Sequence, residues 1–463
     1  MRKYLFFFGP ASVLALGALV ACESDPPGGG STPELDSGLP DSNPPPHTDG
    51  GGGPDATPDA PEVPGVNVTV FGYGGPKAGV RVVFHDATGA VMETKLTGPD
   101  GKAKHIGETP AMASALLSFG ESRRIVTWTG VELGDDLQVL DREEDDHIGM
   151  YSITLPGEPD GGANTYTVES ECDRNLAYGT AAELPLYRSC TRPKNAVLAT
   201  ALSRGDLRGY AFKKGNAAVT DGGTGAFTLG AWVTPTPFTV DVTNLPPETF
   251  YEASLLEVAD GAGFRNYESN QEGATITYGV APGFADAYQA SISFADSGRD
   301  RRVAKRVAPG TPSTTLDYDA ILPEIEGAEL DATNPQRPIV SWTSAAPLTT
   351  TDGGVIHVRF DGPQERTFAW TFVVPGNATT VTAPAMPPEA ESFLPPAPDS
   401  GTETYFYLPR VMFIEGDAIP SYAAFRRQQG LFLDHTTSFN GRDLPVLPAN
   451  GAYRTTSWDA VPR

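Results

Sequence analysis

Apolar and polar residues alternate in Val66-Asn67-Val68-Thr69-Val70-Phe71 and again in Gly79-Val80-Arg81-Val82-Val83-Phe84. A period of two places one set of side chains on one face of a strand, so each stretch predicts a β-strand with a buried face. Asp86-Ala87-Thr88-Gly89 is a turn sequence that leads into a third alternating stretch, 91–97, and Pro99-Asp100-Gly101 is a second turn. Two turns this close between short strands predict hairpins in an antiparallel sheet.

The order of these turns and strands carries a family resemblance. The frame Pro76…Gly79-Val80-x-Val82-x-Phe84-x-Asp86…Gly89…Thr97…Asp100-Gly101-Lys102-Ala103 resembles the carboxypeptidase-regulatory-like, or transthyretin-like, β-sandwich domain over residues 66–155. The resemblance implies a seven-stranded sandwich that serves as an accessory or binding module. It implies no catalytic residue.

Short strand-like stretches continue beyond residue 155. The chain contains 51 Gly and 43 Pro, which favour turns over long helices. We expect a β-rich domain over 156–328. Its strands are predicted at Ala226–Val233, Phe238–Val242, Ala274–Val280 and Ala290–Phe294.

Two later segments resemble fibronectin type III sandwiches. Leu245-Pro246-Pro247-Glu248-Thr249-Phe250-Tyr251 is similar to the corner before strand F, where the Tyr hydroxyl bonds back to the backbone. In the expected domain 329–463, a Trp-containing strand (338–343) precedes a Pro corner and an aromatic strand (405–408), with Ser392 at the position of the corner Tyr. The predicted fold class is therefore all-β, with consecutive antiparallel sandwich modules of immunoglobulin or transthyretin type.

The N-terminus reads as an export signal. Arg2 and Lys3 precede an apolar stretch that ends in Leu19-Val20-Ala21-Cys22, and small residues at that point are typical of a cleavage site. Leu-Val-Ala-Cys also resembles the lipobox of bacterial lipoproteins. The resemblance implies a signal peptide over 1–21, lipidation of Cys22 and, with Glu23 next, anchoring in the outer membrane of the cell envelope. Several acyl chains on one residue make a lasting membrane anchor.

Residues 22–65 are predicted to form a disordered tether behind this anchor. Between 23 and 65 the chain has eleven Pro, nine Gly, nine acidic residues and no Lys or Arg. Such a segment buries too little apolar surface to offset the entropy lost on ordering. It would hold the folded part away from the membrane surface.

The remaining two cysteines, Cys172 and Cys190, predict a disulfide. An exported chain with one cysteine assigned to lipid most simply pairs the other two. The alternative is a metal site, but neither a CxxC spacing nor a nearby His supports it. The sequence predicts no metal and no cofactor.

Charge limits the classes of partner. The formal net charge is −25, which argues against nucleic acid and against broad contact with anionic lipid. The expected partners are the membrane, through the lipid anchor, and an envelope polysaccharide or protein.

Three local features have both a functional and a structural interpretation. Clustered carboxylates over 135–146 suggest a calcium loop or a solvated acidic loop. The basic run 299–306 suggests docking of an anionic polysaccharide or lipid head group, or pairing with acidic neighbours across a sheet. The aromatic residues suggest a glycan-binding face or sandwich core, and the core reading is favoured. They are Trp128, Trp232, Trp342, Trp370, Trp458 and Tyr405-Phe406-Tyr407.

No short catalytic motif is present. The sequence lacks GxSxG, HExxH, GxGxxG and P-loop patterns, and its six His are scattered. We therefore expect a non-catalytic binding or structural role. The alternative is a secreted, glycan-acting hydrolase, because such enzymes need only two suitably spaced carboxylates that no local motif reveals.

Overall fold

The computed structural model describes residues 64–459 except 142–146, 363–365, 397–404 and 429–445, and except interruptions of one or two residues between 160 and 297 and at 408 and 448. These residues belong to one compact unit, Glu62–Arg463. The expected signal peptide, Cys22 and nearly all of the expected tether lie outside the described residues. Where the chain is described, none of its helices has the length and apolar character needed to cross a membrane.

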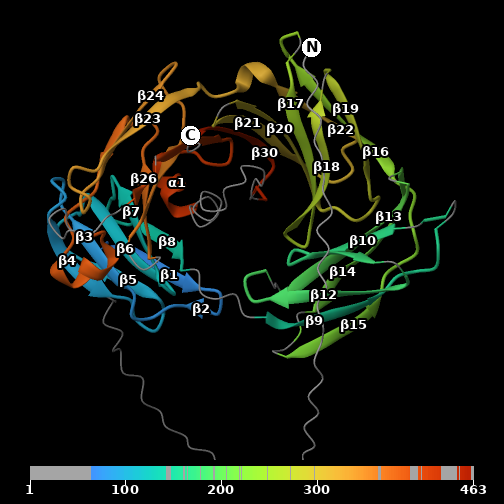
Figure 1. Cartoon of the computed structure of the whole chain (residues 1–463), viewed down its shortest axis with the longest axis horizontal. Helices are drawn as coiled ribbons and strands as arrows, with labels where there is room; N and C mark the ends of the chain where they lie inside the picture. Colours follow the sequence, from blue (N-terminus) through green and yellow to red (C-terminus); the bar gives the residue numbers. More distant parts are fainter. Residues whose placement is uncertain are drawn as a thin grey trace, which may run out of the picture. The chain divides into compact units, whose positions relative to one another are not determined.

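The described chain is built almost entirely of strands (Figure 1). Among the described residues, the α-helix α1 spans Tyr422–Gln428, and short 3-10 helices lie at Tyr318–Ala320 and Pro388–Phe393. The predicted all-β fold class is confirmed.

The first module is a sandwich of two sheets. One sheet contains β1 (Val66–Gly72), β2 (Gly75–Pro76), β5 (Lys102–His105) and β8 (Asp136–Leu140). The facing strands are β3 (Arg81–His85), β4 (Val91–Leu96), β6 (Met112–Phe119) and β7 (Ser122–Thr129). Val68 of β1 and Phe84 of β3 are fully buried in one core, as the alternating pattern predicts.

The two predicted turns have different consequences. At the first, Gly89 N donates to Asp86 O and the flanking strands β3 and β4 pair as a hairpin. At the second, Gly101 N donates to Gly98 O, but β5 pairs with β1 in the facing sheet, so the expectation of a second hairpin is wrong. A turn sequence specifies that the chain reverses, whereas burial of Ala103 against the facing sheet selects the strand with which β5 pairs.

In each of three successive modules, the first strand pairs in parallel with the last strand. These pairs are β1 with β8, β9 (His147–Thr154) with β15 (Gly223–Thr228), and β16 (Thr236–Thr243) with β22 (Ser313–Asp317). The sheets are therefore mixed and not purely antiparallel. The expected boundary at 155 follows β9, although β9 pairs with β12 and β15 of the second module. The expected domain 156–328 therefore lacks the first strand of the second module and contains the whole of the third.

The second and third modules contain the remaining central strands. In the second are β10 (Thr165–Glu169), β11 (Arg174–Ala177), β12 (Ala181–Tyr187), β13 (Lys194–Ser203) and β14 (Asp206–Ala217). In the third are β17 (Tyr251–Ala259), β18 (Ala262–Gln271), β19 (Thr275–Val280), β20 (Ala287–Asp296) and β21 (Arg299–Val307).

The predicted corner tyrosine, Tyr251, begins β17. Its hydroxyl donates to the backbone carbonyl of Gly273 at 2.5 Å, downstream in the chain. The fibronectin-type bond back to an upstream residue is therefore not the one that forms, because β17 is followed by the β18 hairpin that brings Gly273 beside it.

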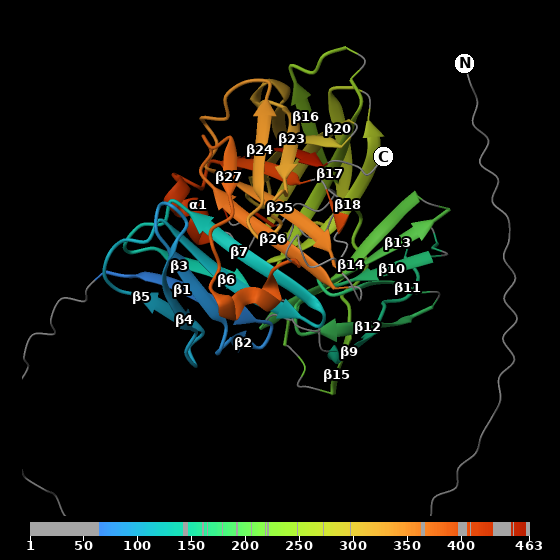
Figure 2. The same ribbon diagram turned by 60° about the vertical axis from the view of Figure 1, so that its left-hand side comes forward.

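The last region contributes β23 (Ile325–Asp331), β24 (Ile339–Ser344), β25 (Gly353–Asp361), β26 (Thr367–Val374), β27 (Thr380–Thr382), β28 (Tyr405–Phe406), β29 (Arg410–Gly416) and β30 (Gly451–Asp459). It does not stand apart from the other modules. Strand β26 pairs in parallel with β7, and β30 pairs with β21, so one 13-stranded sheet joins the first module, the last region and the third module (Figures 1 and 2). This pairing satisfies strand edges that separate sandwiches would leave open.

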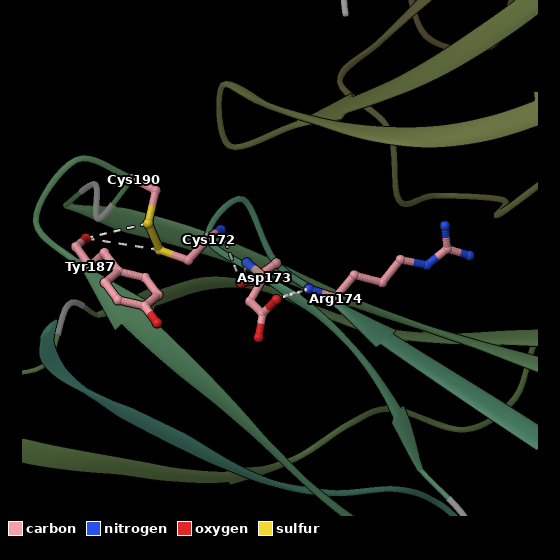
Figure 3. Close-up of a disulfide and its surroundings, with 6 residues drawn as sticks. Cys172, Asp173, Arg174, Tyr187 and Cys190 are labelled. Atoms are coloured by element: carbon pink, nitrogen blue, oxygen red, sulfur yellow. Dashed lines mark hydrogen bonds between the residues drawn. A yellow bond between two sulfur atoms is a disulfide. The ribbon is translucent and has the colours of Figure 1, made fainter. Parts of the chain in front are cut away.

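The predicted disulfide between Cys172 and Cys190 is confirmed, with the Cα atoms 5.1 Å apart. It ties the β10–β11 turn to the segment after β12, beside the backbone carbonyl of Tyr187 (Figure 3). The two sulfurs are bonded to each other, which excludes them as ligands of a metal site.

Candidate functional site at the seam of two modules

Strands β7 and β26 form a seam between the first module and the last region. The indole Nε1 of Trp370 donates to Thr127 Oγ1 at 2.9 Å across this seam, and both residues are fully buried. At the end of the pair, Thr129 Oγ1 donates to the carbonyl of Val373 at 3.0 Å. Buried polar groups that satisfy each other fix the register of the two strands.

Helix α1 closes the end of the seam. Tyr422 Oη lies 2.8 Å from the carbonyl oxygen of Thr129 and 2.9 Å from that of Val373, one on each strand. One turn later, Arg426 forms a buried ion pair with Asp135 of the first module. Contacts from helix α1 to the first module and to β26 therefore hold the end of the seam together.

A cavity of about 480 Å³ opens beside the seam. This volume lies in the range of sites that bind small ligands. The walls come from the β3–β4 turn, the start of β6, the ends of β7 and β26, and strand β27. The lining residues are Ala87, Thr88, Gly89, Met112, Thr129, Arg337, Val374, Pro375, Ala378, Thr380, Val381, Thr382, Ala383 and Pro384. We call this cavity the seam pocket.

Arg337 supplies the charge in the seam pocket. Its Nε donates to the carbonyl of Ala383 at 3.2 Å, which orients the guanidinium group. In the part of the chain that the structure describes, no carboxylate lies within ion-pair distance of this side chain. An oriented guanidinium presents a fork of N–H donors that suits a carboxylate.

Gly89 lines the pocket beside the guanidinium of Arg337. Its φ is +78°, and a Cβ at this position would lie 3.1 Å from the Cα of Pro384 and 3.6 Å from Nη2 of Arg337. The glycine thus permits both the turn and the close approach of the guanidinium. The carbonyl of Gly89 accepts from the backbone N–H of Ala385 at 2.8 Å, which connects the turn to the chain that leaves β27.

Strand β27 presents an open edge at the pocket. It is the outer strand of the sheet β23–β24–β27. Trp342 N donates to Thr379 O, and Ala383 N donates to Pro338 O, both at 3.0 Å. Hydrogen-bonded pairs alternate along an antiparallel strand, so the backbone groups of Thr380 and Thr382 point away from β24.

A His–Ser pair in the first module resembles a base and nucleophile but is closed to substrate. His85 Nε2 lies 3.0 Å from Ser114 Oγ, which lies 2.8 Å from Thr127 Oγ1. All three side chains are fully buried. Burial lowers the pKa of His85 to about 4, so the imidazole is neutral near pH 7. The pair joins the polar network of the seam and has no surface at which a substrate could meet it.

A carboxylate group at the start of β25 was not apparent from the sequence. Asp352 Oδ2 accepts from Gly416 N at 2.7 Å, and burial raises the pKa of Asp352 to about 6. Glu415 and Asp417 are neighbours, and each pairs with Arg454. Raised carboxyl pKa values are a property of general acids, although buried structural carboxylates share it.

Two carboxylates of the acidic stretch 135–146 form ion pairs with different basic residues. Asp135 pairs with Arg426, and Asp141 pairs with Lys77 at 2.8 Å. Residues 142–146 lie outside the described residues. Among the residues that are described, no group of three or more His, Cys, Asp or Glu has the arrangement of a metal site.

The basic run 299–306 lies in β21, between β20 and β30 in the large sheet. Arg299 pairs with Glu324, and Arg302, which is buried, pairs with Asp300 at 3.3 Å. Arg306 donates to the backbone carbonyl of Leu447. The structural interpretation of this run, pairing within and beside a sheet, fits these contacts.

The large aromatic side chains mostly form core. Trp128, Trp342 and Trp370 are buried, and Trp232 and Trp458 pack partly buried against core clusters. Tyr407 is exposed, and its hydroxyl donates to Asp361 Oδ2 at 2.6 Å. The expectation that aromatics form sandwich core is confirmed for Trp128, Trp342 and Trp370.

Comparison with known proteins identifies no family. No family model matches the sequence, and no curated protein matches it. Among solved structures, the Bacillus anthracis TIE protein is 10% identical, with 55% of this chain and 50% of that chain covered and a TM-score of 0.16. This chain thus spans half the length of that protein.

Two further neighbours are β-rich. A candidate cell-adhesion protein from Bacteroides eggerthii is 11% identical over 37% of this chain and 87% of its own, with a TM-score of 0.15. Fibronectin domains FN1–FN3 of chicken CNTN1 are 11% identical over 54% of this chain and 85% of theirs, with a TM-score of 0.14. At such TM-scores these likenesses support no statement about function.

Proposed function

We propose that this chain is a lipid-anchored cell-envelope protein that binds another envelope component without transforming it. The observation that carries the proposal is the seam pocket, a preformed cavity whose walls come from two modules joined by one continuous sheet. Pre-organised walls reduce the entropy lost on binding. The export signal, Cys22 and the tether extend the proposal to an outer-membrane location, and the first module is proposed to be of the carboxypeptidase-regulatory-like type.

Lipidation and location are tested together. Cells that express the chain are fed an alkyne fatty acid and fractionated. The wild-type protein should carry the label and sediment with outer membrane, whereas Cys22→Ala should lose the label and become soluble. Cys172→Ala is the matched control, because it removes a cysteine and should leave the label in place. Label that survives Cys22→Ala would contradict the anchor.

A second candidate, the glycan-acting hydrolase, is favoured only by Asp352 and its raised pKa. The soluble Cys22→Ala chain is incubated with envelope polysaccharides, peptides and esters, and binding is measured beside turnover. Binding without turnover supports the binding role. Turnover that Asp352→Asn abolishes, while Asp361→Asn leaves it unchanged, would establish the hydrolase in its place.

A further inference from the structure

We propose that the seam pocket binds the C-terminal end of an extended peptide, which adds a strand to β27 and places its terminal carboxylate on Arg337. The inference rests on the proposed function, since it names the partner class of the same pocket. The partner is a protein or peptide with an accessible C-terminus.

The open edge of β27 supplies the first half of the recognition. Thr380 and Thr382 direct a backbone N–H and C=O away from β24, toward the side on which the structure describes no strand paired with β27. An edge strand in this state is a template for an added strand, and backbone hydrogen bonds are the usual source of affinity in such complexes. The pocket borders this edge, because Thr380, Val381 and Thr382 line it.

Arg337 supplies the second half. Its guanidinium is oriented by the carbonyl of Ala383, the residue that follows β27, so the charge lies at the C-terminal end of this strand. The described lining contains no carboxylate, and the net charge of the chain is −25, which makes an oriented cation here locally distinct. A charge-assisted, forked contact to a carboxylate is the interaction that arginine makes best.

The lining favours a peptide over an acidic sugar. Sugar rings are commonly stacked on aromatic side chains. The described lining contains none, and instead offers small apolar surface from Met112, Val374 and Pro375. Such surface suits the aliphatic side chains of an extended peptide, whose backbone can pair with the outward N–H and C=O groups of Thr380 and Thr382.

The test uses the full Cys22→Ala chain and two matched probes. The first is a mixture of N-acetylated pentapeptides, randomised at the last three positions, with a free C-terminal carboxylate; the second is the same mixture amidated at the C-terminus. Retention is measured by affinity selection and mass spectrometry, and the retained sequences are resynthesised for calorimetry. We expect free-acid peptides to bind at least about tenfold more tightly than their amides, because hydrogen bonds between charged groups are the stronger ones.

Variants at Arg337 assign this preference. Arg337→Gln should lower affinity for the free acid by about tenfold or more and leave affinity for the amide unchanged, so that the preference disappears. Arg366→Gln is the matched control, since Arg366 is exposed, pairs with Glu121 and does not line the pocket. A preference that survives Arg337→Gln overturns the assignment of the carboxylate.

Variants at Thr382 test strand addition. Thr382→Pro removes the outward N–H and leaves the bonds to β24, so both peptide classes should lose affinity. Thr382→Val removes the hydroxyl but keeps the N–H, and it should bind as the parent does. Unchanged thermal unfolding of both variants confirms that they are folded. Equal binding by Thr382→Pro and Thr382→Val overturns strand addition.

Failure of this inference is distinguishable from failure of the proposed function. Suppose that the wild type is labelled and membrane-bound. If the Cys22→Ala chain then retains no peptide, or binds oligosaccharides ending in a uronic acid through Arg337, the peptide inference alone is overturned. A chain that hydrolyses the peptides overturns the proposed function as well.

Discussion

Arg426 of α1 and Asp135 of the first module form an ion pair with 2.8 Å between Nη2 and Oδ2, and each side chain is 2% exposed. The pair joins residues almost three hundred positions apart in the sequence and lies beside the seam. The ring of Tyr422 stacks against the same guanidinium, with its centroid 4.7 Å from Cζ of Arg426. Arginine, tyrosine and aspartate together hold the C-terminal helix against the first module.

Breaking this pair should weaken the seam strongly. Arg426→Met leaves a buried carboxylate without its main partner, and we expect a loss of about 3–5 kcal/mol in the opening free energy of β7 and β26. Native-state hydrogen exchange of those amides measures it. Arg427→Met is the control, because Arg427 is 54% exposed and lies 3.8 Å from the same aspartate, so its loss should stay below about 1 kcal/mol. Equal losses would contradict the role of Arg426.

The bond from Trp370 to Thr127 should also stabilise the seam. Trp370→Phe keeps an aromatic ring but removes the indole donor, so the same amides should open more easily by about 1–3 kcal/mol. Trp342→Phe makes a similar truncation at a buried tryptophan for which the described residues show no indole hydrogen bond. The loss at Trp370 should exceed the loss at Trp342; a smaller one would mean that the hydrogen bond contributes little.

Glu257 should make stability fall as pH rises. Its side chain is 2% exposed, its Oε2 accepts from Ala281 N at 3.0 Å, and burial raises its pKa to about 8. Between its unfolded pKa of about 4.5 and pH 8 the folded state holds the proton more tightly than the unfolded state does. The stabilisation is therefore complete below about pH 4.5 and is lost as pH rises toward 8.

Comparison with Glu257→Gln isolates this effect from other titrating groups. The wild type minus variant difference in opening free energy of the third module should decline by roughly 1 kcal/mol per pH unit across this window and level off above it. Hydrogen exchange at pH 5, 6.5 and 8 measures the difference. A difference that stays constant, or that rises with pH, would show that the carboxyl is not held neutral.

The Cys172–Cys190 disulfide should stabilise the second module alone. Replacing both residues by alanine removes a cross-link with a sequence separation of 18, which the chain-entropy model values at roughly 3 kcal/mol. Amides of β10, β11 and β12 should exchange faster, while those of β7 and β26 should not change. Reduction of the wild type with a phosphine should reproduce this pattern, and unchanged exchange in β10–β12 would contradict it.

Local sequence was sufficient to predict the strands themselves. Val66–Phe71 and the stretch that begins at Gly79 became β1 and β3 because alternation places one set of side chains in a core wherever the partner strand lies. Cys172 and Cys190 were predictable for a similar reason, since two remaining cysteines in an exported chain have one simple pairing.

The seam pocket had no such signal in the sequence. Arg337 lies between Gln336 and Pro338 in a stretch without any motif, and Gly89 is one turn glycine among many. Their proximity depends on β27 and the β3–β4 turn, which come from segments about 290 residues apart. Only chain packing places an oriented guanidinium beside an open strand edge.

The sequence by itself determined that this chain forms short strands, where the turns lie and which cysteines pair. Tertiary structure decided which edges meet: β26 with β7, β30 with β21, and β5 with β1 instead of β4. The physical reason is that side-chain alternation encodes the face of a strand, whereas its backbone N–H and C=O groups are the same in every residue except proline. Pairing between distant edges is therefore selected by the packing of whole modules, through contacts such as Trp370 with Thr127 and Arg426 with Asp135.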